Sequence, residues 1–464
     1  MNTEKPGLIV WAYRLLFLAV VSSPMDADFL QFELSGFTVR IYQVLFLLTG
    51  VLFFISMPKT WLKTFVRLPG RIFSFDSLYL RLYDYFIVGI FLASIIGGLL
   101  FSSDLVFTGT KIAIFGSFLG VYFLVRYAIR DVDHLKGIVK SLLFGHFLVL
   151  LFGLYQTIAY KVGWPHFMIM EGRVNSLLYE PDWLGVWSAT IVGLLLPFFY
   201  GYHIYRKRIL LFLYLTTLIM LVSISRSGWV AAIAVIGVFF FFKFANKHNP
   251  FKIWWQRFAV LIITIGLAIG TVQGFDLTPF NLQNRFLSIF TQQEIAQVQL
   301  TPEGGEVIIS EEEAEEIRRV EEETGQRARI SVKGVQDENV TRRINSFWES
   351  INLIAQNPVF GVGPGGVEEE FGEGMNTSNI FLGVGTKSGV VGMILFIGIV
   401  YLLFKQGWFI LQFDAIWGWS MILSSMAFLT ANMFNDGFFL GFFWVFLAVW
   451  SRIPDFFIPE EIED

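Results

Sequence analysis

Residues 209–242 read ILLFLYLTTLIMLVSISRSGWVAAIAVIGVFFFF, and this stretch decides the fold. Two apolar runs, Ile209–Ile224 and Trp229–Phe242, meet at the four residues Ser225-Arg226-Ser227-Gly228. Apolar runs of this kind, repeated along a chain, predict helices that cross a lipid bilayer. An arginine between two such runs is costly unless it lies in water or meets an anion, so Arg226 marks a candidate site.

The composition agrees with a membrane protein. Of the 464 residues, 55% are hydrophobic and only 16% are charged, which is more apolar side chain than the core of a soluble protein holds. We therefore predict an all-α polytopic integral membrane protein. With a net charge of −4 and no basic patch, the chain gives no indication of a nucleic-acid partner.

Cysteine chemistry is excluded because the chain contains no cysteine. The five histidines are scattered, so neither their spacing nor a carboxylate cluster predicts a metal site. We therefore expect no metal.

Repeated apolar segments predict about twelve membrane spans. In chain order they cover residues 8–23, 39–57, 84–102, 105–126, 138–162, 182–202, 209–224, 228–243, 255–274, 378–404, 414–432 and 436–452. The first segment resembles the apolar part of a signal peptide, but we interpret it as an uncleaved helix because further spans follow.

The basic residues predict the orientation. Most lie in alternate connections between the spans, which the positive-inside rule assigns to the cytoplasm together with both termini. These basic residues are Lys59, Lys63, Arg67, Arg71, Arg81, Arg126, Arg130, Lys136, Lys140, Arg206, Lys207, Arg208, Lys243, Lys247, Lys252, Arg257 and Lys405. The segment 163–181, the turn at Arg226 and the polar insert 275–377 then lie outside.

This organisation predicts three parts: an N-terminal bundle (1–274), an extracytoplasmic loop domain (275–377), and a C-terminal bundle with an acidic tail (378–464). The centre of the insert, Glu303–Glu323, is strongly acidic, and we expect Glu311–Glu323 to form a solvated helix. Apolar residues at helical spacing predict an amphipathic helix over Arg342–Gln356.

Four polar patches lie on the predicted outer face. The first contains Arg173, Glu180 and Asp182. Acidic residues around Pro181 are also typical of a helix N-terminus, where they complement the helix dipole. Arg173 has no such explanation, and we expect it to pair with Glu171 or Glu180.

The second patch is Arg226 with Ser225 and Ser227. A guanidinium, hydroxyl groups and free amides at a helix start are suited to a phosphate or diphosphate. The alternative is an interfacial arginine that reaches toward water.

The third patch is the glycine turn Gly361–Gly366, which includes Gly363 and Gly365; it follows no strand, so it does not predict a nucleotide-binding loop. The fourth is Asn376-Thr377-Ser378-Asn379, where Asn376 or Ser378 also suits helix capping. Lys387 lies about two turns further along this helix, where we expect it to face the bundle interior or a water-filled cavity. Gly363, Gly365 and Lys387 are candidate substrate-binding residues, as are Ser225 and Ser227. Asn432, Asn435 and Asp436 form a further polar patch to which the sequence assigns no role.

In this order the patches resemble the O-antigen ligase and polysaccharide polymerase superfamily. The matching motifs are Arg173-x-x-Ser176-x-x-x-Glu180-Pro181-Asp182-x-x-Gly185, Ser225-Arg226-Ser227-Gly228, Arg343 before an aromatic helix, Asn357-Pro358-x-x-Gly361-Val362-Gly363-Pro364-Gly365, and Ser378-Asn379-x-x-Leu382 with Ser388-Gly389-x-x-Gly392. The resemblance covers about residues 165–405, and the earlier spans match only as membrane helices.

This resemblance implies inverting glycosyl transfer at the outer leaflet of the bacterial inner membrane. A glycan passes from a polyprenyl diphosphate carrier to an acceptor hydroxyl, and the sugar–diphosphate bond supplies the energy, so no cofactor is expected. By this resemblance, Arg173 and Arg226 are expected to bind the diphosphate. Arg343 is expected to steer the substrate or to brace the loop. The carrier-linked glycan, a glycan or lipid acceptor and the bilayer are the expected partners.

One departure from the family pattern concerns proton transfer. Ligases of this superfamily usually carry His-Asn where this chain has Ser378-Asn379, and serine is a poor general base. Either Glu180, Asp182 or Glu368–Glu370 takes the proton, or the reaction needs little base assistance. The missing histidine favours a polymerase over a ligase. Lys387 also replaces a position that is often acidic in the family.

Two other classes remain as alternatives. A flippase or transporter for lipid-linked oligosaccharide would carry ionisable residues near the bilayer midplane and inverted repeats. This chain has one such lysine and no visible repeat. The other alternative is a non-catalytic envelope-assembly protein that uses the acidic insert for contacts.

Overall fold

The computed structural model describes residues 6–34, 37–56, 82–245, 251–291, 293–300, 306–309, 330–336, 338–371, 377 and 379–457. Within these ranges the chain divides into two compact units. The larger unit takes its residues from 1–278 and 347–464, and the smaller unit takes residues 279–346. The first basic-rich connection, residues 57–81, and the acidic segment Glu311–Glu323 lie outside the described residues.

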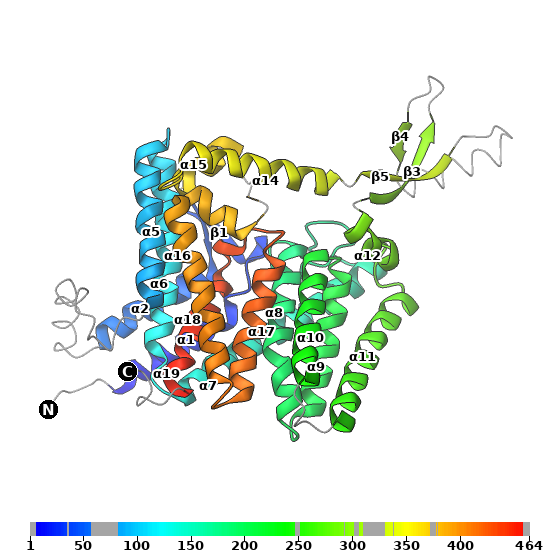
Figure 1. The fold of residues 1–464 in the computed structure, drawn as a ribbon, viewed down its shortest axis with the longest axis horizontal. Coiled ribbons are helices and arrows are strands. Elements are labelled where there is room, and N and C mark those ends of the chain that lie inside the picture. The colour runs from blue at the N-terminus through cyan, green and yellow to red at the C-terminus, as the bar shows by residue number, and fades with distance from the viewer. Residues whose placement is uncertain are drawn as a thin grey trace. The chain divides into compact units, whose positions relative to one another are not determined.

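The larger unit is a bundle of apolar helices (Figure 1). It contains α1 (Pro6–Ser22), α2 (Ile41–Ser56), α5 (Leu82–Phe101), α6 (Leu105–Ala128), α7 (Val132–Val162), α8 (Pro181–Gly201), α9 (Arg206–Val222), α10 (Arg226–Ala245), α11 (Phe251–Gly274), α15 (Gly363–Phe371), α16 (Ile380–Ile410), α17 (Ala415–Ala431), α18 (Gly441–Arg452) and α19 (Pro454–Phe457).

Every span predicted from the sequence overlaps one of these helices, although the last, 436–452, overlaps only the 12-residue α18. Among the described residues, seven helices are long and apolar enough to cross a membrane: α5, α6, α7, α8, α10, α11 and α16. Three more apolar helices, α1, α2 and α17, are shorter. The prediction of an all-α polytopic membrane protein is confirmed.

Short acidic and amide side chains start several of these helices. Asp104 accepts hydrogen bonds from the first free amides of α6, Asp131 does so for α7, and Asp414 does so for α17. Such caps satisfy amide groups that have no partner within the helix, and each typically contributes about 1 kcal/mol. The sequence therefore sets where the chain leaves each loop and enters a helix.

Helix α8 lies at the centre of the bundle and packs against α9, α10 and α17 (Figure 1). Its residues from Leu184 to Pro197 are all buried. A helix that is apolar on every face is stable only when other helices surround it. The first turn of α8, which carries Asp182, is therefore held in a fixed place by the rest of the bundle.

Helix α16 is broken at Gly389, whose φ of 66° lies in the left-handed region. The glycine turn fits into this break. The amide of Val362 donates to the carbonyl oxygen of Thr386 at 2.8 Å, and the amide of Val390 donates to the carbonyl oxygen of Pro358 at 2.8 Å. Backbone groups freed by the break thus find partners in the turn, as burial of peptide groups requires.

The glycines of this turn permit backbone contact with neighbouring helices. A Cβ atom on Gly363 would lie 2.3 Å from Gly98 Cα on α5, and one on Gly365 would lie 2.2 Å from Thr108 Oγ1 on α6. The structure therefore explains Gly363 and Gly365, which we predicted to bind substrate, by close packing of helices.

The smaller unit contains a sheet that we did not predict. It consists of α12 (Leu282–Thr291) followed by the antiparallel sheet β4-β3-β5, with β3 (Gln293–Leu300) between β4 (Glu306–Ile309) and β5 (Ile330–Gln336). The predicted amphipathic helix is present as α14 (Glu338–Gln356), which crosses the boundary between the units at Ser346. Ile344 and Trp348 on α14 are exposed, whereas Leu353 is buried.

Candidate functional site

The turn between α9 and α10 is strained. Ile224 has a φ of 57°, in the left-handed region that a β-branched residue rarely adopts. Such a conformation costs on the order of 1–3 kcal/mol and persists only where the surroundings enforce it. The next residue, Ser225, is fully buried, and Arg226 begins α10. Backbone strain at Ile224 therefore lies directly beside the arginine that the sequence singles out.

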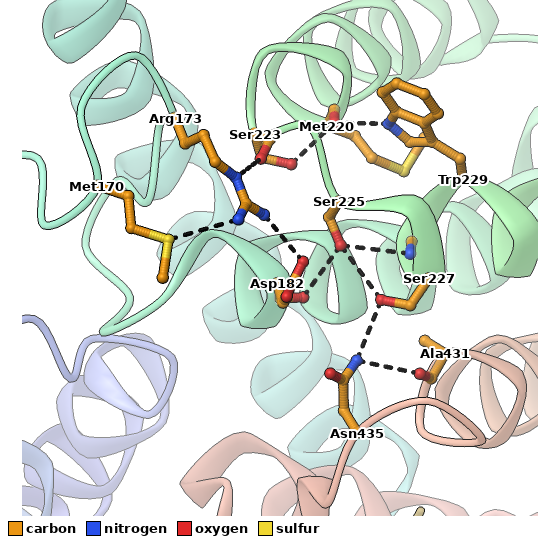
Figure 2. A network of polar contacts seen from close by, with 11 residues as sticks. Met170, Arg173, Asp182, Met220, Ser223, Ser225, Ser227, Trp229, Ala431 and Asn435 are labelled. Carbon is orange, nitrogen blue, oxygen red and sulfur yellow. Dashed lines mark hydrogen bonds and ion pairs between the residues drawn. The ribbon is translucent and has the colours of Figure 1, made fainter. Parts of the chain in front are cut away.

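Two buried serine hydroxyls flank Arg226 and face the protein (Figure 2). The Ser225 hydroxyl lies 3.4 Å from the carbonyl oxygen of Asp182, to which it donates, and 3.2 Å from Ser227 Oγ. Asn435 donates from Nδ2 to Ser227 Oγ at 3.1 Å. We predicted that these hydroxyls bind substrate, whereas the structure gives both of them protein partners.

Helices α8 and α10 touch through two glycines next to this network. A Cβ atom on Gly228 would lie 2.7 Å from Gly185 Cα, and one on Gly185 would lie 2.1 Å from Ser225 Oγ. The glycines in Ser225-Arg226-Ser227-Gly228 and in the motif that ends at Gly185 are thus partners. Their contact brings the first turn of α8 against the first turn of α10.

We expect Gly228→Ala to destabilise the protein by about 1–3 kcal/mol, the typical cost of overpacking, because the added methyl group would collide with the backbone of α8. Chemical unfolding in detergent micelles measures this change. Gly237→Ala is the matched control on the same helix, since nothing lies within 4 Å of its added Cβ atom. Equal stability of the two variants would contradict the predicted contact.

Arg173 reaches the same turn from the segment before α8 (Figure 2). Its Nη2 atom lies 3.1 Å from Asp182 Oδ1, and its Nε atom donates to the carbonyl oxygen of Ser223 at 3.4 Å. We expected Glu171 or Glu180 as its ion partner, and the structure shows Asp182. Arg173 therefore contacts the turn that leads to Arg226, three residues after Ser223.

The segment that carries Arg173 is fastened to α7 and α9. The amide of Ser176 donates to Gln156 Oε1 at 2.6 Å, and the Ser176 hydroxyl donates to the carbonyl oxygen of Val149 at 2.5 Å. The amide of Val174 donates to the carbonyl oxygen of Val222, the last residue of α9, at 3.4 Å. Buried Ser176, which belongs to the motif around Arg173, therefore supports this arginine together with buried Gln156, which the sequence did not indicate.

Glu180 occupies the N-cap position of α8 without making a side-chain cap hydrogen bond. Pro181 follows as the first helical residue, where a missing amide proton costs nothing. Glu180 and Asp182 are both partly exposed at this helix start. Two carboxylates and two arginines, Arg173 and Arg226, thus gather at the adjoining starts of α8 and α10.

A second group of predicted residues lies at the start of α16. Asn379 accepts a hydrogen bond from the amide of Phe381 at 2.8 Å and donates to the carbonyl oxygen of Met433 at 3.2 Å. Asn379 therefore caps α16. The residues that we expected as caps, Asn376 and Ser378, lie outside the described residues. Lys387 is buried, as predicted, and forms an ion pair with buried Asp436.

The loop after α17 connects the two groups. Asn435 holds Ser227 beside Arg226, Asp436 holds Lys387, and Met433 accepts from Asn379. Asp436 also accepts a hydrogen bond from the Thr377 hydroxyl at 3.2 Å. The polar patch Asn432, Asn435 and Asp436, to which the sequence assigned no role, thus contacts residues of both α10 and α16. In the sequence it was visible only as three polar side chains between two apolar runs.

A comparison with known protein families shows what part of the chain is similar to. Residues 209–397 match the family model described as O-Antigen ligase (Wzy_C). The resemblance to the O-antigen ligase superfamily is confirmed. The match supports glycosyl transfer of the ligase or polymerase type on lipid-linked glycan by a bacterial membrane protein. No curated protein matches the chain.

The O-antigen ligase match contains Arg226, Asn379 and Lys387, whereas several residues that contact the matched region lie outside it. Arg173 and Asp182 precede the matched region, and Asn435 and Asp436 follow it. Side chains from before and after the matched residues therefore contribute to the candidate site.

Two further predicted residues are placed separately. Arg343 belongs to the smaller unit, on α14. Glu368 on α15, a candidate base, lies 2.6 Å from Lys111 Nζ on α6 through its Oε1 atom and 2.7 Å through Oε2. Glu368 is thus the ion partner of Lys111.

Proposed function

We propose that this protein transfers a glycan from a polyprenyl diphosphate carrier to an acceptor hydroxyl at the outer face of the bacterial inner membrane. One observation carries the proposal: Arg173 contacts the carbonyl oxygen of Ser223, on the turn that leads into Arg226. Two arginines far apart in sequence thus lie at the adjoining starts of α8 and α10, which is an arrangement suited to a diphosphate.

The chemistry requires stabilisation of the leaving group. The acceptor oxygen forms a bond to the anomeric carbon, and the bond from that carbon to the carrier phosphate breaks with inversion. The electron pair leaves with the diphosphate, whose charge increases in the transition state. Fixed guanidinium groups and the positive end of the α10 dipole stabilise that charge without reorganising.

The proton of the acceptor hydroxyl goes to a carboxylate in this proposal. Glu180 and Asp182 are the candidates because both lie in the first turn of α8, next to Arg173. Asp182 also orients Arg173 through their 3.1 Å contact. We therefore assign orientation of the arginine to Asp182 and proton acceptance to Glu180.

Polymerisation is the form of transfer that we favour. Ser378 stands where ligases carry histidine, and Asn379 beside it is engaged in capping α16 and in holding Met433. With Ser225 and Ser227 bonded inside the protein, their proposed role is to position Arg226. Arg343 steers the glycan in this proposal, and Lys387 supports the fold.

Transfer by the wild-type protein tests the function. In right-side-out membrane vesicles that contain carrier-linked glycan, we expect a membrane-impermeant acceptor glycan to be lengthened while free polyprenyl diphosphate is released. Mass spectrometry measures both products. Inverted vesicles are the control, because the acceptor would meet only the cytoplasmic face. Transfer in inverted vesicles alone would contradict the orientation, and no transfer in either would contradict the function.

A further inference from the structure

A buried carboxylate on the N-terminal part of the chain holds the entry to α8. Asp26 lies between α1 and the short helix η1 (Asp28–Leu30), and it is only 5% exposed. Its Oδ1 atom accepts a hydrogen bond from the backbone amide of Tyr179 at 2.8 Å. This contact joins residues that are 153 positions apart in the sequence.

The backbone around Asp26 makes the connection stronger. The amides of Asp26 and Ala27 both donate to the carbonyl oxygen of Leu177, at 2.9 and 3.0 Å. Leu177 and Tyr179 are therefore held by three hydrogen bonds from one short segment. Tyr179 is followed directly by Glu180 and is three residues before Asp182, the ion partner of Arg173.

We propose that Asp26 is a positioning residue for glycosyl transfer, which sets the path of the chain into α8 and thereby the place of Asp182 and Arg173. The inference rests on the function proposed above. Asp26 touches no part of the arginine site itself, so its effect passes through the backbone of Leu177 and Tyr179.

The charge of Asp26 gives this connection a pH dependence. Burial raises the pKa of Asp26 to about 6, although the positive charge of Arg40 and the hydrogen bond from the Tyr179 amide act in the opposite direction. The charged and titratable groups that face it are Arg40, Tyr42, Tyr179 and the exposed Asp28. Below about pH 6 the carboxylate is protonated, and a neutral oxygen is a weaker acceptor for the Tyr179 amide.

Hydrogen exchange tests the contact without reference to activity. In the detergent-solubilised full chain at pH 7.5, we expect Asp26→Ala to raise the exchange rate of the peptide covering residues 177–182 by roughly tenfold, the factor for loss of one charge-assisted hydrogen bond. Asp28→Asn is the matched control, since Asp28 is exposed two residues away. An unchanged exchange rate in Asp26→Ala would overturn the inference.

The pH profile of transfer tests the consequence. We expect the wild-type rate to fall as the pH decreases through about 6, because Asp26 becomes protonated. Asp26→Asn removes the charge at every pH, so its rate is expected to be roughly tenfold lower at pH 7.5 and to lack this decline. An Asp26→Asn profile with the same acid limb as wild type would overturn the inference.

Failure of a variant to fold and absence of transfer by the wild-type protein lead to different conclusions. If Asp26→Asn does not fold because Arg40 loses its anion, the variant Asp26→Asn/Arg40→Gln removes both charges, and its profile decides in the same way. If the wild-type protein transfers no glycan at any pH, the proposed function fails, whereas the exchange experiment still decides whether Asp26 holds the entry to α8.

Discussion

Arg226→Ala is expected to lower the rate of glycan transfer by about 10²–10³-fold, the typical effect of removing one preorganised group that stabilises a developing charge. Arg226 begins α10 on the turn that Arg173 contacts, so its loss removes half of the proposed diphosphate site. In cells, carrier-linked glycan should accumulate on the outer leaflet while long-chain glycan disappears. Glycan analysis and the vesicle assay measure these effects.

Two further variants separate charge from position. Arg226→Lys keeps the positive charge but loses the planar fork that binds two phosphate oxygens, so we expect an intermediate rate. Arg208→Ala removes an exposed arginine near the opposite end of α9, and its rate should equal that of wild type. Normal glycan in both Arg226→Ala and Arg173→Ala cells would disprove the enzyme. Accumulation of carrier-linked glycan on the inner leaflet would favour the flippase alternative.

The sequence predicted the helices because apolar runs long enough to span a bilayer have few other stable structures. It also singled out Arg226, since a charge beside such a run requires water or an anion. Arg173 was singled out because the helix start at Pro181 does not explain a basic residue. The pairing of Arg173 with Asp182 could not be read in the same way. Spacing along the chain favoured Glu171 or Glu180, and only the path of the backbone into α8 decides among three carboxylates.

The contacts made by the loop after α17 could not be predicted from the sequence either. Asn435 lies 208 positions from Ser227, and nothing local to either residue indicates the other. The sequence identified glycines as conformationally permissive. The reason that Gly185 and Gly228 must be glycine is the contact between their backbones, which depends on how two helices pack. The sheet of the smaller unit was missed because the insert was interpreted from its acidic composition. Apolar and polar residues do alternate over Ala296–Leu300 in β3 and over Ile330–Lys333 in β5, which is the pattern of a strand.

Lys387→Met is expected to destabilise the protein by about 3–5 kcal/mol, because it leaves the carboxylate of Asp436 buried without its partner. Asp436→Asn should cost a similar amount for the opposite charge. Lys387→Met/Asp436→Asn removes both charges and keeps an oxygen that can accept from the Thr377 hydroxyl, so most of the lost stability should return. Unfolding of the four proteins in detergent gives the coupling energy of the pair.

The same four proteins decide what Lys387 does. We predicted from the sequence that it binds substrate, yet its charge is neutralised by Asp436 inside the protein. Affinity for free polyprenyl diphosphate, measured by calorimetry, should therefore be unchanged in the double variant, since the pair it removes carries no net charge. A stable double variant that no longer binds the diphosphate would show that Lys387 contributes to substrate binding. Unchanged affinity would leave Arg173 and Arg226 as the cations that hold the carrier.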